Sequence, residues 1–254
     1  MEQYINKIIN ADCMDILKQL PDKCIDAIIC DLPYGTTACS WDVIIPFDKL
    51  WEQYKRIRKD NTPIVLFGSE PFSSYLRMSN IKEYKYDWYW NKDKGNGIFL
   101  AKIQPLRTIE TISVFYKNQC LYNPQMTKAQ IDRIRPLSFG NKNGAKNNIV
   151  NSNNCKTDKE YNPEMRYPLN LLTFTKPVGK DIHPTQKPIN LLEYLIKTYS
   201  NEGDLILDNC SGSGTTAVAC HNLKRRFICI EKDEDYYKAS VERLENTKAQ
   251  LKLF

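Results

Sequence analysis

The stretch that decides the fold is LILDNCSGSGTTAVACHNL, residues 205–223, in which three local patterns follow one another. Residues 205–207 form an apolar run that predicts a buried strand, and residues 215–223 have the pattern of a helix. Between them, Gly212 and Gly214 form a Gly-x-Gly turn, whose lack of side chains lets the backbone approach a ligand closely. The stretch therefore predicts a strand, a ligand-binding turn and a helix.

The residues around this turn narrow the type of ligand. The turn is not a P-loop, because no Gly-Lys-[Ser/Thr] follows it, and Ala217 stands where the full dinucleotide fingerprint has its third glycine. The next predicted strand, residues 226–230, leads into Glu231, which is placed to accept hydrogen bonds from a ribose. A turn that only reverses the chain is the simpler alternative. Strand, turn, helix, strand and acid together favour a nucleoside site.

The alternation of strand and helix patterns extends along most of the chain. Further strands are predicted at residues 25–30, 63–67, 84–90 and 111–116, and further helices at residues 48–59, 188–199 and 233–253. We expect the strands at 84–90 and 111–116 to form an antiparallel pair. The pattern as a whole predicts an α/β protein with a mostly parallel sheet, covered by helices on both faces. In such sheets ligands bind at the carboxyl ends of the strands.

The composition is that of an ordinary globular protein. Of the 254 residues, 42% are hydrophobic and 26% are charged. No apolar run reaches the roughly 20 residues needed to span a bilayer, and the first residues lack the layout of a secretory signal. Nine cysteines without a Cys-x-x-Cys pair, together with only two histidines, indicate reduced thiols rather than disulfides or a zinc site. We therefore expect a cytoplasmic protein with no metal and no membrane contact.

The net charge of +6 is concentrated in one quarter of the chain. Residues 117–180 contain eleven Lys or Arg and four Asp or Glu, which makes this segment +7 and the remainder −1. The segment also carries an Asn-rich run, residues 141–154, and several aromatic residues. Cations attract phosphates and amides can read base edges, so this composition suits a nucleic-acid surface. A solvated insertion without a ligand is an equally good interpretation of the composition alone.

Candidate catalytic residues follow a second predicted strand. The strand predicted at residues 25–30 leads into Asp31-Leu32-Pro33-Tyr34, which puts an acid, a proline and an aromatic ring at its carboxyl end. An aromatic residue near an acid at a strand end is usually plain packing. Its importance here comes from its combination with the glycine-rich turn.

Four segments in this order resemble one known family, the S-adenosylmethionine-dependent DNA amino-methyltransferases of adenine N6 and cytosine N4. Residues 31–34 resemble their Asp-Pro-Pro-Tyr catalytic motif, and residues 208–215 resemble their Asp-Pro-Phe-x-Gly-x-Gly-Thr cofactor motif. Residues 183–188, HPTQKP, are similar to the segment that precedes the cofactor motif, and residues 10–13 are similar to the stretch that contacts the cofactor's adenine. The catalytic motif precedes the cofactor motif, which is the circularly permuted order of the β class.

The resemblance implies a Rossmann-like methyltransferase sheet, circularly permuted and mostly parallel, with a terminal antiparallel hairpin and an inserted target-recognition region. The expected division is a catalytic half (1–116), a target-recognition insertion (117–180) and a cofactor-binding half (181–254). The expected partner is double-stranded DNA. A homodimer and a cognate restriction endonuclease are left open.

The resemblance also implies the site residues. The catalytic residues would be Asp31, Leu32, Pro33 and Tyr34. The S-adenosylmethionine site would comprise Asp12, Cys13, Asp31, Thr185, Lys187, Asp208, Ser211, Gly212, Gly214, Thr215 and Glu231, with Thr185 and Lys187 near the methionine carboxylate. The candidates for DNA contact are Lys92, Lys128, Arg133, Arg135, Lys142 and Lys146.

The chain departs from the family motifs at two places. Leu32 replaces the first proline of the catalytic motif, and Asn209-Cys210 replaces Pro-Phe in the cofactor motif. Leu32 keeps the backbone carbonyl that the catalytic contact needs. We predict transfer of a methyl group to adenine N6, because Asp rather than Ser begins the catalytic motif. The alternatives are a cytosine-N4 methyltransferase, a catalytically inactive DNA-binding regulator, and an enzyme acting on RNA or on protein glutamine.

Overall fold

The structure is a computed structural model, and it describes residues 1–37, 39, 42–128, 164–175 and 186–251. The chain divides into two compact units, one made of residues 1–123 and 170–254 and the other of residues 124–169. The small unit contains a two-stranded antiparallel sheet of β6 (Thr127–Lys128) and β7 (Met165–Arg166). Among the described residues, no helix has both the length and the apolar character needed to cross a bilayer.

The large unit is built on one eight-stranded sheet with the order β1-β10-β9-β2-β3-β5-β4-β8. The strands are β1 (Lys7–Asn10), β2 (Ala27–Cys30), β3 (Ile64–Gly68), β4 (Tyr84–Asn96), β5 (Arg107–Phe115), β8 (Leu171–Thr173), β9 (Leu205–Asp208) and β10 (Arg226–Glu231). Neighbouring strands are parallel except where β5 lies between β3 and β4, to both of which it is antiparallel. The mostly parallel sheet with an antiparallel hairpin is confirmed.

The sheet order explains how two distant motifs come together. Strands β2 and β9 are neighbours and parallel, although β2 precedes β9 in the chain by most of the length of the protein. The catalytic and cofactor motifs follow these two strands directly. Because parallel strands end at the same edge of a sheet, both motifs lie at one edge.

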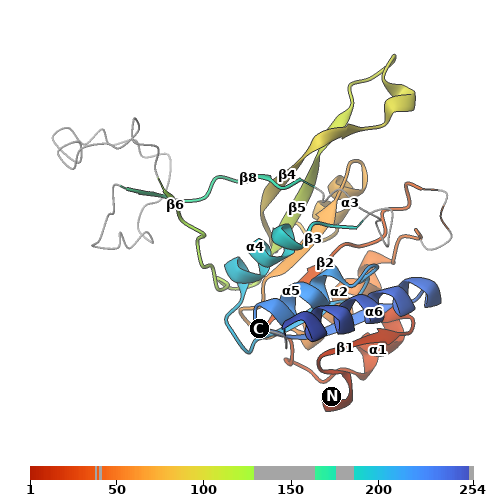
Figure 1. The fold of residues 1–254 in the computed structure, drawn as a ribbon, viewed down its shortest axis with the longest axis vertical. Helices are drawn as coiled ribbons and strands as arrows, with labels where there is room; N and C mark the ends of the chain where they lie inside the picture. The colour runs from red at the N-terminus through yellow and green to blue at the C-terminus, as the bar shows by residue number, and fades with distance from the viewer. Residues whose placement is uncertain (38, 40–41, 129–163, 176–185, 252–254) are drawn as a thin grey trace. The chain divides into compact units, whose positions relative to one another are not determined.

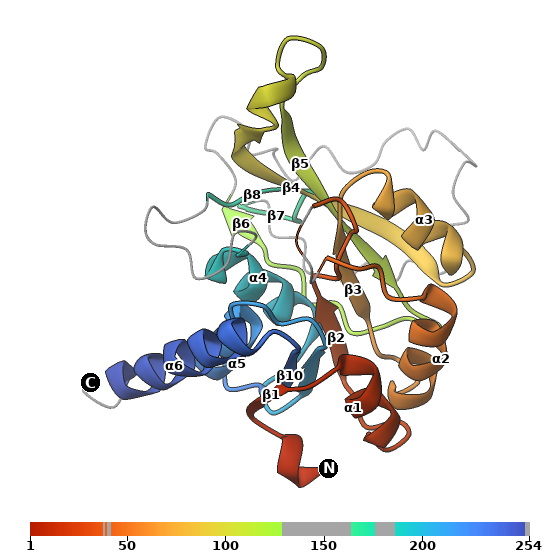
Figure 2. The same ribbon diagram turned by 90° about the vertical axis from the view of Figure 1, so that its right-hand side faces the viewer.

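Helices cover both faces of the sheet, as the alternating pattern predicts (Figures 1 and 2). The helices are α1 (Cys13–Gln19), α2 (Phe47–Ile57), α3 (Phe72–Ser79), α4 (Ile189–Tyr199), α5 (Thr215–Asn222) and α6 (Glu234–Leu251), and two 3-10 turns are η1 (Glu2–Tyr4) and η2 (Ile98–Leu100). Helices α1, α2 and α3 pack on one hydrophobic core, and α4, α5 and α6 pack on a second core. Successive residues of β2 alternate between the cores: Ala27 and Ile29 face one, and Ile28 and Cys30 face the other.

Strand β8 is an element that the sequence did not predict. It adds Leu171–Thr173 to β4 in parallel register, beyond the antiparallel hairpin, and thereby forms the edge of the sheet. A three-residue strand is too short to leave an alternating pattern in the sequence. Its residues come from the segment expected to be the target-recognition insertion, but they belong to the large unit.

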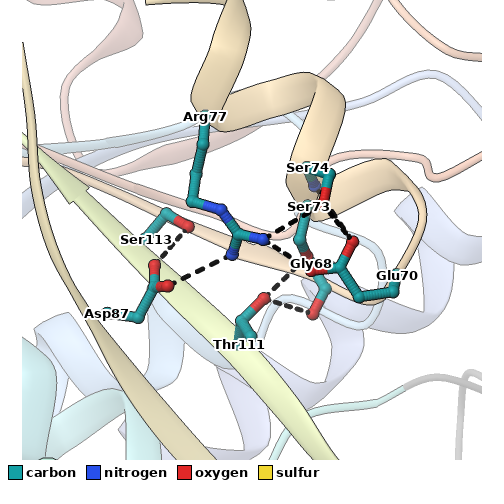
Figure 3. A network of polar contacts seen from close by, with 8 residues as sticks. All are labelled: Gly68, Glu70, Ser73, Ser74, Arg77, Asp87, Thr111 and Ser113. Carbon is teal, nitrogen blue, oxygen red and sulfur yellow. Dashed lines mark hydrogen bonds and ion pairs between the residues drawn. The ribbon is translucent and has the colours of Figure 1, made fainter. Parts of the chain in front are cut away.

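A polar network ties helix α3 to strands β3, β4 and β5 (Figure 3). The Arg77 guanidinium donates to Asp87 on β4 at 3.1 Å and to Glu70 before α3 at 2.5 Å. On β5, the Thr111 hydroxyl donates to the backbone carbonyl of Gly68 at 3.1 Å. The network fixes the end of β3 against Thr111, where the pairing of β5 with β3 begins. This region borders the candidate site.

Candidate active site

One cavity of about 860 Å³ lies at the carboxyl ends of the central strands. Both predicted motifs line it, the catalytic motif through Asp31–Tyr34 and the cofactor motif through residues 208–213. Residues 11–14 after β1, and residues 231–234 at the end of β10 and just beyond it, complete this part of the wall. Tyr34 and Gly212 therefore open onto the same space.

Both glycines of the cofactor turn have left-handed backbone conformations, with φ of 50° at Gly212 and 71° at Gly214. A Cβ added to Gly214 would lie 2.9 Å from Ser240 Cβ, so the turn also needs glycine for close packing against α6. The Gly212 amide donates to Glu231 Oε2 at 2.7 Å, and the Asp233 amide donates to Oε1 at 2.8 Å. Backbone amides thus aim the Glu231 carboxylate at the edge of the cavity.

Helix α6 holds the other side of the turn. Arg243 donates to the Ser213 carbonyl at 3.0 Å and to Thr215 Oγ1 at 3.0 Å. Ser211 Oγ is buried at the cavity wall and has no hydrogen-bond partner among the described residues. A buried hydroxyl without a partner is costly, so this atom favours a polar ligand in the cavity.

The Asp208 carboxylate accepts hydrogen bonds from residues of the turn and of α5. Its Oδ2 accepts from the Thr216 hydroxyl at 2.5 Å, and its Oδ1 accepts from the Cys210 amide at 3.2 Å. Burial disfavours the charged form and raises the pKa of Asp208 to about 6, although these hydrogen bonds oppose the shift. Asp208 therefore joins the end of β9 to the first turn of α5.

The raised pKa of Asp208 predicts a specific pH dependence of stability. The folded state holds this proton more tightly than the unfolded chain does, so the contribution is full below the unfolded value of 3.8 and is lost as the pH rises through about 6. Relative to Asp208→Asn, the wild type should lose about 2–3 kcal/mol of unfolding free energy between pH 4 and 7. Urea unfolding of both proteins across this range measures the difference. Parallel pH profiles would contradict the assignment.

Leu32 and Asn209 are buried, whereas Cys210, the third residue that departs from the family motifs, is half-buried. Leu32 is 3% exposed and belongs to the core under α1, α2 and α3. Asn209 is also buried, and its side-chain carbonyl accepts from the Tyr54 hydroxyl of α2. Interaction with the Cys210 thiol lowers the pKa of Cys13. The Asn209 contact thus joins the end of β9 to α2.

The catalytic motif presents a carboxylate that protein groups already orient. Asp31 Oδ1 accepts from the Tyr34 hydroxyl at 2.6 Å, and Oδ2 is ion-paired with the Lys187 ammonium. Burial raises the pKa of Asp31, and the nearby Lys187 opposes that rise. The Tyr34 ring packs on Phe72 with centroids 4.9 Å apart, and burial raises the pKa of Tyr34, which keeps its hydroxyl protonated.

Two lysines of the cavity wall are paired with acids. Lys187 is buried, its ammonium is ion-paired with Asp31, and it lies 3.5 Å from Glu110 Oε2. Lys92, a candidate for contact with DNA, lines the cavity, is 8% exposed and is ion-paired with Glu110 Oε1 at 2.9 Å. Strand pairing places Glu110 of β5 opposite Trp90 of β4. Lys92 is two residues beyond Trp90, so it meets Glu110 in the cavity wall.

Sequence reasoning missed Asp42, which organises the loop after the catalytic motif. Its carboxylate accepts from the amides of Gly35, Thr36 and Thr37 at 2.8, 2.9 and 2.7 Å, and from the Thr37 hydroxyl at 2.8 Å. Burial opposes ionisation, but these bonds outweigh it and lower the pKa of Asp42. An acid shortly after Gly-Thr-Thr was the available signal, because such acids often cap turns.

The remaining candidates lie in several places. Asp12 caps helix α1 by accepting from the Met14 amide at 3.0 Å and is ion-paired with Lys232 at 3.1 Å. Lys128 lies on β6 of the small unit. Thr185, Arg133, Arg135, Lys142 and Lys146 lie outside the described residues. Within the described part of the chain, no group of three or more His, Cys, Asp or Glu side chains could hold a metal ion.

Comparison with known proteins identifies the family. The family model described as DNA methylase, of the N6/N4 type, matches residues 25–242. The type II methyltransferase M1.MboII of Moraxella bovis is 26% identical over 252 residues, covering 91% of this chain and 94% of its own. M.HpaI of Haemophilus parainfluenzae is 27% identical over 253 residues, covering 94% of this chain and 74% of its own.

Solved structures agree with this result. The crystal structure of an M1.HpyAVI–SAM complex has a TM-score of 0.62 at 26% identity and covers 94% of this chain and 98% of its own. The cytosine-N4-specific PvuII methyltransferase shares the fold, with a TM-score of 0.65 at 16% identity over 96% of this chain and 91% of its own. The chain belongs to the N6/N4 DNA methylase family. It is an S-adenosylmethionine-dependent DNA amino-methyltransferase.

The residues present fit the cofactor. The unpartnered Ser211 hydroxyl and the two glycines offer a polar wall that a ligand can approach closely. The Glu231 carboxylate is fixed at the end of β10, where a ribose binds in related nucleotide sites.

Proposed function

We propose that this protein is a site-specific DNA methyltransferase that methylates the N6 amine of an adenine flipped out of duplex DNA. The observation that carries this proposal is the shared cavity, which the catalytic motif and the cofactor turn line together. An enzyme that joins a donor to a base needs both sites in one space, because reacting atoms must be held about 3–3.5 Å apart. The family and the names of its relatives support the substrate class.

We further propose that the cofactor is held by the turn and the neighbouring strand ends. Glu231 would bind the ribose hydroxyls and Asp12 the adenine amine, while Ser211, Gly212 and Thr215 would surround the methionine. The supporting geometry is the orientation of Glu231 by two backbone amides and the orphaned Ser211 hydroxyl. When bound, S-adenosylmethionine supplies an electrophilic methyl group on a positively charged sulfur.

The catalytic motif would activate the amine by position rather than by deprotonation. The lone pair of an exocyclic amine is delocalised into the ring, and two acceptors aimed at its N–H groups localise that lone pair. The Asp31 carboxylate and the Leu32 carbonyl would be these acceptors. Asp31 keeps free lone pairs for this role, because an ionised carboxylate has about four acceptor sites. The Tyr34 ring would stack on the flipped base, a contact worth about 1–3 kcal/mol.

The choice of adenine rests on the motif, since Asp31 occupies a position where serine tends toward cytosine in this family. DNA contacts are proposed for the basic segment 117–180, in which Lys128, Arg133, Arg135, Lys142 and Lys146 would lie on phosphates. Such contacts are independent of sequence and would position the duplex rather than read it. Base recognition would come from the amide and aromatic residues of the same segment.

Mapping the modified base tests the proposed function directly. The protein is incubated with isotopically labelled S-adenosylmethionine and unmethylated genomic DNA, and the nucleosides of the digested DNA are separated and identified by mass. We expect labelled N6-methyladenine. Labelled N4-methylcytosine alone would replace adenine by cytosine as the substrate. DNA binding without any labelled base would favour a regulator, and labelled RNA or peptide in parallel reactions would exclude DNA as the preferred substrate.

A further inference from the structure

Four charges of alternating sign run through the wall of the cavity. Lys187 is ion-paired with Asp31 on one side and lies 3.5 Å from Glu110 Oε2 on the other, and Glu110 Oε1 is 2.9 Å from Lys92. The side chains of Lys187 and Lys92 are both 8% exposed, and that of Glu110 is 15% exposed. Asp31, with 24% exposure, is the member of the chain most open to the cavity.

The chain of charges is assembled from four separate parts of the fold. Asp31 follows β2, Lys187 precedes the Pro188 that begins α4, Glu110 is on β5 and Lys92 is on β4. Desolvating four charges costs several kcal/mol for each ion, a cost that is offset only when each charge has well-placed partners. A protein that needed one carboxylate merely as part of its core would be more stable with apolar residues here. The arrangement therefore points to a use of the charge on Asp31.

Lys187 is confined as well as paired. Its ammonium lies 5.3 Å from the centre of the Phe67 ring, 5.9 Å from that of Tyr34 and 6.0 Å from that of Trp90. Aromatic faces attract a cation and exclude water from it. Glu110 is in turn next to Thr111, which the network of Figure 3 fixes on Gly68. The position of the ammonium is thus set from several sides.

We propose that Lys187 is a positioning residue that keeps the Asp31 carboxylate charged and turned toward the target amine. The proposal rests on the proposed function, in which Asp31 accepts an N–H of that amine. Lys187 and the Tyr34 hydroxyl bind different oxygens of Asp31, so together they fix the plane of the carboxylate. In methyl transfer the N–CH₃ bond would form as the S–CH₃ bond breaks with its electron pair left on sulfur, and the amine nitrogen would carry positive charge until it loses an N–H proton. A fixed negative charge next to the nitrogen stabilises that change.

The pairing predicts opposite effects of removing the two partners. The groups that face Asp31 are Lys187, Glu110, Tyr34, Cys30 and Asp208, while Lys92 faces Glu110. Lys187 favours the ionised form of Asp31, and Glu110 opposes it. Lys187→Met removes the cation and leaves Glu110, so the pKa of Asp31 should rise. Glu110→Gln removes the competing anion, so the pKa of Asp31 should fall.

The test measures single-turnover methylation of DNA from pH 5 to 9, together with the dissociation constant for S-adenosylmethionine. For Lys187→Met we expect the acid side of the rate profile to move up by about one pH unit or more, since an opposite charge shifts a carboxyl pKa by about 1–3 units. For Glu110→Gln we expect the acid side of the rate profile to move to lower pH. Lys187→Arg should retain most of the wild-type profile. Cofactor affinity should stay within about threefold in all variants, because the proposed contact is with Asp31.

A second readout keeps the two proposals distinguishable. The carboxyl carbon of Asp31, labelled with ¹³C and assigned by its loss in Asp31→Asn, is titrated by NMR in the wild type and in each variant. If no DNA base is methylated, the proposed function fails, and the direction of the Asp31 titration still decides the pairing. Lys49→Met, on the exposed face of α2, is the matched control and should change neither measurement.

Two results would overturn the proposal. One is a Lys187→Met variant whose Asp31 titration and rate profile are unchanged while its cofactor affinity falls at least tenfold, which would place Lys187 on the methionine carboxylate instead. The other is a shift in the same direction for Lys187→Met and Glu110→Gln, which would indicate a general loss of packing. Circular dichroism and thermal unfolding of each variant verify that the measurements are made on folded protein.

Discussion

Asp31→Ala should lower the single-turnover rate of DNA methylation by about 10²–10³-fold, the effect of removing one fixed electrostatic group from an active site. The variant loses the carboxylate that would accept the N–H of the target amine and stabilise its developing positive charge. Lys187 keeps Glu110 as a partner, so no buried ammonium is left without a counter-charge and the fold should persist. Rates are measured with labelled S-adenosylmethionine on DNA that carries the mapped site.

The binding of S-adenosylmethionine separates this effect from damage to the cavity. We expect a dissociation constant within a few-fold of the wild type, because the proposed cofactor contacts of the turn and of Glu231 remain. Asp60→Ala is the matched control, since Asp60 is an exposed acid paired with Lys23 at 3.3 Å. Near-normal turnover of Asp31→Ala would exclude the catalytic role of this carboxylate. An equally large loss in Asp60→Ala would indicate a general effect on the protein.

Gly214→Ala should destabilise the fold and weaken cofactor binding together. Gly214 has a φ of 71°, and an added Cβ would lie 2.9 Å from Ser240 Cβ and 3.3 Å from Ile8 Cδ1. The left-handed conformation costs a residue with a side chain about 1–2 kcal/mol, and overpacking against α6 adds about 1–3 kcal/mol. Because relief of the clash moves the turn, we expect cofactor affinity to fall at least tenfold.

Gly203 provides a control that isolates the clash from the strain. Its φ is 83°, but an added Cβ would meet no atom within 4 Å. Gly203→Ala should therefore show the conformational cost alone, with unchanged cofactor affinity. Urea unfolding and calorimetric titration of both variants give the comparison. Equal losses of unfolding free energy in the two variants would show that the approach of Ser240 to Gly214 has no energetic weight.

The parts of the fold that could be predicted from the sequence are those encoded locally. Strand β9, the turn at Gly212 and Gly214 and helix α5 are contiguous in the chain, so apolar runs and glycines reveal them without knowledge of the rest. The motif Asp31–Tyr34 could be predicted for the same reason. Strands β2 and β9, which lead into these two motifs, are neighbours in the sheet.

What could not be predicted depends on pairing between distant elements. Glu110 is one charged residue in a strand, and only the register of β5 with β4 shows that it meets Lys92 inside the wall. In the sequence alone, Lys187 cannot be distinguished from a surface lysine. Its place next to Asp31 depends on how the segment before α4 packs. Asp42 follows the catalytic motif closely, but its three backbone partners exist only once the loop has formed.

The small unit leaves and rejoins the large unit at two anchored residues. The Asn123 amide donates to the Thr198 carbonyl at the end of α4 at 2.8 Å, and the Asn170 carbonyl accepts from the Tyr89 amide on β4 at 2.7 Å. Both anchors use main-chain groups, so they do not depend on which residues lie between them. Substitutions within residues 124–169 would therefore leave these two main-chain anchors of the large unit available.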